Sequence, residues 1–181
     1  MTEQTRRFAL VDFPPLLDRP LDTGWPQGVV AQYTVLRYFR ELLSHREEVL
    51  RNEDVEAVHQ IRVAARRTRT ALQTLHPLWD GDEPRRFERY LERFATAYNV
   101  ARDLDVLIIY FESRLADHGD ERAQAYRWLL ERTRKERGRQ QPRLAQALLK
   151  MEEGAFPALF VAYFSRRPFD LWAWGAVRGE S

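Results

Sequence analysis

The sequence predicts an all-α fold, an antiparallel bundle of four to five long helices. Apolar residues recur at steps of three and four over most of the 181-residue chain, the spacing that places them on one face of a helix. No segment alternates apolar and polar residues as a half-buried strand would. Short stretches rich in proline, glycine and aspartate separate the periodic segments and predict the turns between helices.

The pattern divides the chain into three regions. Residues 1–25 contain three prolines and no sustained period, so we expect an irregular N-terminal arm. Residues 26–164 carry the periodic segments and are predicted to form the bundle. Residues 165–181 form a C-terminal tail rich in aromatic and basic residues, which either folds back on the bundle or contacts a partner.

The first two helices are predicted over about 27–50 and 55–76. Either Asn52 or Asp54 has the side chain to cap the start of the second helix. The pair His76-Pro77 should end it, because proline disfavours the helical conformation in the residue before it.

The third helix is predicted to be the longest, from the acidic turn at 80–84 to about 116, where His118-Gly119 would close it. Its apolar stripe has nine members: Phe87, Tyr90, Phe94, Ala97, Ala101, Leu104, Ile108, Phe111 and Leu115.

A fourth helix is predicted over about 121–137, ending at Gly138. A fifth and less regular helix should start at Pro142 and be kinked by Pro157, since proline removes a backbone donor inside a helix.

Composition narrows the classes of function. The formal net charge is only +2, which argues against a protein that binds nucleic acid over its whole surface, so any anion site must be local. The chain has no cysteine, which excludes disulfides and thiolate metal sites. We find no long apolar run and no secretory signal, and we therefore expect a cytoplasmic protein that does not enter a membrane.

The most informative segment is Val58–Arg69, in which His59, Arg62, Arg66 and Arg69 form what we call the basic row. At about 100° per residue these four side chains lie within an arc of roughly 80° and span about 15 Å of helix. No acidic residue interrupts them, and guanidinium groups bind phosphate oxygens in bidentate fashion. The alternative interpretation is an ordinary solvated basic face.

Further candidates lie outside the basic row. Arg102, in the segment Tyr98–Val106, is expected to add a guanidinium from a facing helix, with Asp103 or Asp105 orienting it or a neighbouring arginine; the alternative is an ordinary interhelical ion pair. Secondary contributions are expected from Arg67, Arg86 and Arg93. The basic stretch 132–143 is either a second patch or, more simply, a solvated helix end.

Two motifs, Val-His-Gln-Ile-Arg-Val-Ala-Ala-Arg-Arg-Thr-Arg at 58–69 and Ala-Arg-Asp-Leu-Asp-Val at 101–106, resemble the CHAD family, the conserved histidine α-helical domain. The resemblance covers residues 30–118 well. It implies a helical bundle that binds inorganic polyphosphate and can associate with polyphosphate granules. It also implies that His59, Arg62, Arg66, Arg69 and Arg102 lie on the binding face.

One departure from the family pattern concerns its usual repeat. A second histidine-bearing basic motif is typical of the family, and no histidine follows residue 118. The sequence therefore resembles a half-length member with only the first motif-bearing repeat. The hypothesis that follows is a homodimer in which a second copy supplies the missing half.

The sequence does not indicate an enzyme. It lacks a glycine-rich phosphate loop, a His-Glu-x-x-His motif and a Gly-x-Ser-x-Gly elbow, so we expect no catalytic residue, metal site or cofactor. Two alternative partners for the basic row are nucleic acid and an acidic protein surface. Nucleic acid is disfavoured because the row lacks interleaved aromatic residues for base stacking. If His59 contacts the anion, binding should strengthen as the pH falls.

Overall fold

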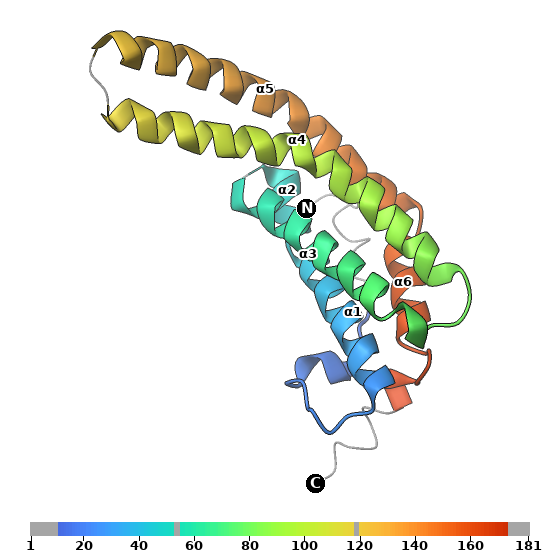
Figure 1. The fold of residues 1–181 in the computed structure, drawn as a ribbon. Helices are drawn as coiled ribbons and strands as arrows, with labels where there is room; N and C mark the ends of the chain where they lie inside the picture. Colours follow the sequence, from blue (N-terminus) through green and yellow to red (C-terminus); the bar gives the residue numbers. More distant parts are fainter. Residues whose placement is uncertain (1–10, 53–54, 118–119, 174–181) are drawn as a thin grey trace.

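The structure, a computed structural model, describes residues 11–52, 55–117 and 120–173 (Figure 1). Within these ranges it contains helices and turns but no strand, which confirms the predicted all-α fold. The helices are α1 (Gln27–Ser44), α2 (Arg46–Arg51), α3 (Val55–Thr74), α4 (Glu83–Asp117), α5 (Asp120–Glu153) and α6 (Phe156–Phe164), with 3-10 helices η2 (Pro15–Asp18) and η3 (His76–Leu78).

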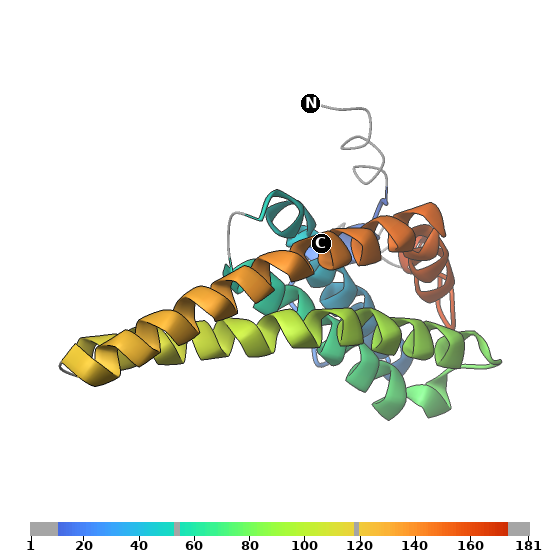
Figure 2. The ribbon, with the colours of Figure 1, turned by 90° about the horizontal axis from the view of Figure 1, so that it is seen from above.

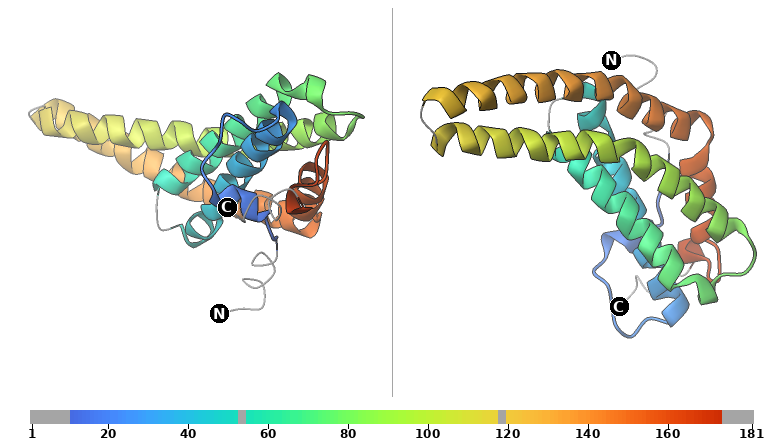
Figure 3. Two further views of the ribbon diagram at one scale, coloured as in Figure 1. Left: turned by 90° about the horizontal axis from the view of Figure 1, so that it is seen from below. Right: turned by 45° about the horizontal axis from the view of Figure 1, so that its top comes forward.

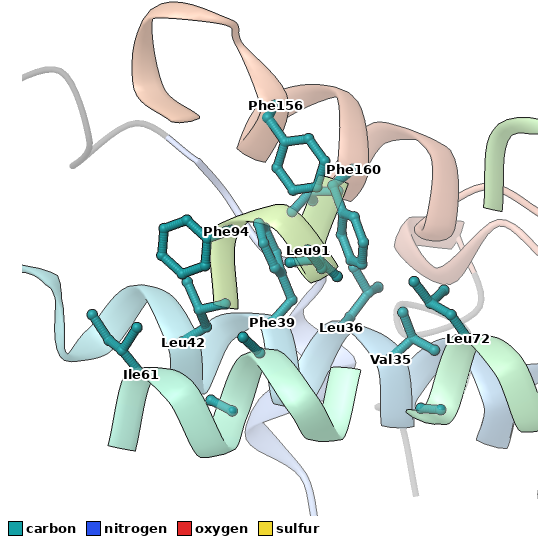
Figure 4. Packing of buried hydrophobic residues seen from close by; sticks show 14 of the residues in the cluster. Val35, Leu36, Phe39, Leu42, Ile61, Leu72, Leu91, Phe94, Phe156 and Phe160 are labelled. Atoms are coloured by element: carbon teal, nitrogen blue, oxygen red, sulfur yellow. The ribbon is translucent and has the colours of Figure 1, made fainter. Parts of the chain in front are cut away.

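The long helices are neighbours in the order α1, α3, α4, α5, and α6 returns to contact both α5 and α1 (Figure 1). They enclose one apolar core, much of which Figure 4 shows. Phe39 of α1 stacks on Phe160 of α6 with ring centroids 4.2 Å apart, and both side chains are fully buried. Burial of a side chain this size contributes about 1.5–3 kcal/mol, so these contacts fix how α6 closes the bundle.

The first predicted helix is divided in two. α1 ends at Ser44, His45 leaves the helical conformation with φ −88° and ψ 3°, and α2 follows at once. The physical reason is the next residue, because buried Arg46 turns toward α5 and pairs with Glu152. Asn52 has φ 55° and caps the C-terminus of α2 rather than starting α3, and Asp54 lies outside the described residues.

The fourth and fifth predicted helices form one helix, so the predicted end at Gly138 and start at Pro142 are wrong. α5 runs through both residues and bends along its length (Figure 1). Pro142 costs about 3 kcal/mol in a helix interior. Buried contacts on either side, at Arg137, Gln140 and Leu144, hold the helix together across it.

The chain breaks instead at Ala155, which has φ 52°. Pro157 then stands in the first turn of α6, where proline is well tolerated, and the predicted kink at Pro157 is wrong. The predicted end of α4 at His118-Gly119 lies outside the described residues.

The segments flanking the bundle pack on α1 as far as they are described. Leu16 and Leu17 of η2 and Leu171 near the other end are buried. Gln32 is fully buried; its amide nitrogen donates to the carbonyls of Phe164 (2.8 Å) and Phe169 (2.7 Å), and its oxygen accepts from the backbone N–H of Phe169 (3.2 Å). Residues 165–173 therefore fold back on the bundle, while 1–10 and 174–181 lie outside the described residues.

The distal ends of α4 and α5 form a hairpin that projects beyond the other helices (Figures 2 and 3). Of the described helices only α5 covers this end of α4, so Ile108, Phe111 and Leu115 of the predicted stripe are half-buried rather than buried. On the opposite face of α4 four apolar side chains are exposed, by 43–56%: Val106, Leu107, Ile109 and Tyr110. The hairpin therefore presents an apolar strip that nothing in the described chain covers.

Candidate anion-binding face

The basic row lies on the outer face of α3, beside the core. Ile61, Ala65 and Leu72 on the inner face are buried and fix the rotation of the helix. His59, Arg62 and Arg69 are half-buried and Arg66 is exposed. Since the backbone carrying the row is held by core packing, the side chains start from a rigid platform.

Contacts between α3 and α4 fix the register of the two helices. Arg69 pairs with Glu92 (3.3 Å) and Gln73 donates to Glu88 (2.5 Å), so four residues forward on α3 correspond to four residues back on α4. The two helices are thus antiparallel. Continued in the same register toward the start of α3, position 102 of α4 corresponds to position 59 of α3.

The positive charges of this face are unevenly compensated. Arg69 shares Glu92, and Arg67 pairs with Glu41 of α1 at 3.1 Å. Among the described residues Arg62, Arg66 and Arg102 have no ion pair within 4.0 Å. Uncompensated charge is therefore concentrated on the middle of the row, at Arg62 and Arg66, and on Arg102.

Three nitrogen atoms of the row are buried without a hydrogen-bond partner in the described structure: His59 Nδ1, Arg62 Nε and Arg69 Nε. An unsatisfied buried polar atom costs about 1–3 kcal/mol. A ligand rich in acceptor oxygens would recover part of this cost wherever small side-chain movements expose these donors.

Asp105 contacts Arg137 of α5 rather than Arg102, and so forms an interhelical ion pair. Its Oδ1 accepts a hydrogen bond from Arg137 Nε of α5 at 2.7 Å, and the carboxylate is fully buried. Burial raises the pKa of Asp105, and the charges of Arg137 and, more weakly, Arg102 oppose this rise. Asp105 is thus part of a structural ion pair, while Asp103 is exposed and has no ion pair among the described residues.

The structure does not bring Arg86 and Arg93 to the basic row. Arg93 follows Glu92, and Arg86 precedes Glu88 by two, so both are rotated by at least about 100° from the side that contacts α3. Arg93 lies instead near Tyr90, where it opposes the rise in pKa that burial causes, and Tyr90 stacks on Phe156 of α6. These two arginines therefore belong to another face.

Three of the six basic residues in the stretch 132–143 form ion pairs. Arg134 pairs with Glu112, Arg137 with Asp105, and Arg139 with Glu136. Among the described residues the other three, Arg132, Lys135 and Arg143, have no ion pair, so the stretch is only partly neutralised, and it lies inside α5 rather than at a helix end.

One arginine near this face was missed by the sequence argument. Arg37 of α1 is exposed, lies over the ring of Tyr33 at 5.9 Å, and lines a depression that also includes Arg67. Nothing in its local sequence distinguishes Arg37, because only the packing of α1 against α3 brings it there.

Among the described residues no group of three or more histidine, aspartate or glutamate side chains is placed to hold a metal ion. No helix in the described part of the chain combines the length and the apolar character needed to cross a bilayer.

Comparison with known proteins gives one match. A family model described as CHAD domain matches residues 34–175, which includes the basic row, the segment around Arg102, and all of α5 and α6. The match extends well past residue 118, where the recognisable motifs end. No curated protein and no solved structure matches the chain.

Proposed function

The chain belongs to the CHAD domain family, and from this premise we propose that it binds inorganic polyphosphate without altering it chemically. The observation that carries the proposal is the basic row. His59, Arg62 and Arg66 lie on a helix held by the core, and the two arginines have no acidic partner in the described structure.

The chemistry of the row suits a polymer with a negative phosphate at every unit. Arginines three or four residues apart on a helix rise about 4.5–6 Å along its axis, so successive guanidinium groups can contact one extended chain. Each charge-assisted hydrogen bond contributes about 1.5–3 kcal/mol, and several together give micromolar binding or better after the cost of association. The location we expect is the cytoplasm, at polyphosphate granules where they form.

The direct test is a titration of labelled long-chain polyphosphate at about 150 mM salt, with double-stranded DNA as competitor. We expect binding that is micromolar or tighter, that weakens steeply with salt as counterions are released, and that DNA does not displace. Absence of binding would contradict the proposal, and displacement by DNA would favour a nucleic-acid binder. Phosphate assayed in the same samples should stay constant, since its release would indicate an enzyme.

We further propose that the chain forms a homodimer through the exposed strip of the α4 hairpin. Asp103, Val106, Leu107 and Tyr110 follow the i, i+3, i+4, i+7 spacing of one helix face. A second copy related by a twofold axis between Val106 and Leu107 would pack these apolar residues together. The same axis sets Asp103 of one copy opposite Tyr110 of the other, whose hydroxyl can donate to the carboxylate.

Sedimentation velocity at micromolar concentration tests this interface. The wild-type protein should sediment as a dimer and Leu107→Asp as a monomer, because the substitution buries a charge at the twofold axis. Leu159→Asp is the matched control, since Leu159 is also an exposed leucine, by 58% against 43% for Leu107, but lies on α6. A monomeric wild-type protein would contradict the proposal.

A further inference from the structure

A groove of about 820 Å³ runs between α1 and α3, directly beside the basic row. A volume of this size is typical of sites for small organic ligands. Its lining contains no acidic residue and consists of Gln27, Val30, Ala31, Thr34, Tyr38, Arg62, Val63, Arg66, Arg67, Thr70, Ala71, Thr74 and Leu75.

The two ends of the groove differ in chemistry. The Arg67–Glu41 ion pair joins the last turn of α1 to the second half of α3. Arg62, Arg66 and Arg67 gather at one end. Ala31, Ala71 and Leu75 line the other end, and Leu75 lies about 12 Å along α3 from Arg67 and about 20 Å from Arg62.

The walls beyond the arginines are more apolar than their residue types suggest. The Thr34 hydroxyl donates to the carbonyl of Val30 within α1, at 2.7 Å. The hydroxyl is therefore satisfied within the helix, and the methyl group is the part of the side chain left to contact a ligand. Val30 and Val63 are only half-buried, so their side chains contribute to the surface of the groove. A polyphosphate chain has no apolar part and would leave this half of the groove unused.

We propose that the groove binds a free single-chain amphiphile with an anionic phosphate head group. The head group lies against Arg62 and Arg66, the two arginines of the groove without an ion pair in the described structure, and the alkyl chain extends toward Leu75. Apolar area removed from water contributes about 25 cal/mol per Å², and the guanidinium groups add charge-assisted hydrogen bonds. The occupant is a monomeric molecule rather than a membrane surface.

The inference does not depend on polyphosphate binding, because it is carried by the apolar half of the groove. The two proposals share only Arg62 and Arg66. A substitution in the apolar half therefore separates them, and an amphiphile bound at the shared arginines should compete with polyphosphate.

The test is isothermal titration of the full chain with dodecyl phosphate, kept below the concentration at which it forms micelles. We expect micromolar binding, with inorganic phosphate and dodecyl maltoside at least about ten-fold weaker because each supplies only half of the interaction. Thr70→Trp places a large side chain in the groove from an exposed position and should weaken dodecyl phosphate at least about ten-fold, with polyphosphate affinity unchanged.

The matched control is Gln146→Trp, an exposed position on α5 away from the groove, which should bind dodecyl phosphate like the wild type. If Thr70→Trp loses its helical circular dichroism, Thr74→Trp replaces it with the same expectation. Undiminished binding by the groove variant overturns the proposal, as does binding only to phosphatidylglycerol vesicles. If the protein binds dodecyl phosphate but not polyphosphate, the proposed function is contradicted and the groove proposal stands.

Discussion

Replacing Asp105 with leucine should lower the free energy of unfolding by about 3–5 kcal/mol, and Arg137→Met should do the same. The two side chains pair at 2.7 Å and are only 0% and 9% exposed, so either single change leaves the other charged group buried without its partner. The Asp105→Leu, Arg137→Met double variant removes both charges and fills the space with apolar groups. Its stability should equal or exceed that of the wild type.

Urea unfolding followed by circular dichroism measures all four proteins and gives the interaction energy of the pair as a double-mutant cycle. A single variant within about 1 kcal/mol of the wild type would mean that the pair is solvated in solution.

The pH dependence of the same cycle has a defined sign. Because burial raises the pKa of Asp105 above its unfolded value, the folded state binds a proton more readily than the unfolded state. The contribution of Asp105 to stability is fully present below its unfolded pKa and is lost as the pH rises through the folded pKa. The wild type should therefore gain stability relative to the double variant as the pH falls through that window.

Reversing the charges of Arg62 and Arg66 together should weaken polyphosphate binding at least about 100-fold. Two charge-assisted contacts worth about 1.5–3 kcal/mol each are lost, and each new carboxylate repels the polymer. These two substitutions give the clearest test because Arg69 already forms an ion pair with Glu92. The measurement is the polyphosphate titration described above, made at a fixed salt concentration because affinity for a polyanion varies with it.

The matched control reverses Arg86 and Arg93, which changes the net charge equally on a face turned away from α3. We expect only a small loss of affinity from this long-range change. Equal losses in the two double variants would mean that net charge alone governs binding and that the basic row is not a site.

Helical periodicity was sufficient to predict the fold class, because long apolar stripes depend only on local spacing. It failed where tertiary contacts overruled a local signal. Gly138 and Pro142 are strong helix breakers in sequence, yet packing around them keeps α5 continuous. His45 carries no breaking signal, and α1 ends there because Arg46 pairs with a residue that is distant in sequence.

The same limit applies to the candidate site. The basic row was predicted because its members share one helix, where rotation per residue is known. The partner of Asp105 could not be predicted, since nothing local relates it to Arg137 on another helix. The groove beside the basic row could also not be predicted from the sequence, because its walls come from two different helices.

Because the hairpin projects beyond the other helices, its length can change without altering the anion-binding face on α3. Toward its C-terminal end α4 projects beyond α3 and is accompanied chiefly by α5 (Figures 1 and 2). Removing or adding about seven residues in each arm shifts the tip by two helical turns and returns nearly the same helix face. Related proteins can therefore differ in the length of this hairpin while α3 stays the same. In an alignment anchored on α3, we expect insertions or deletions of equal length in the two arms of the hairpin.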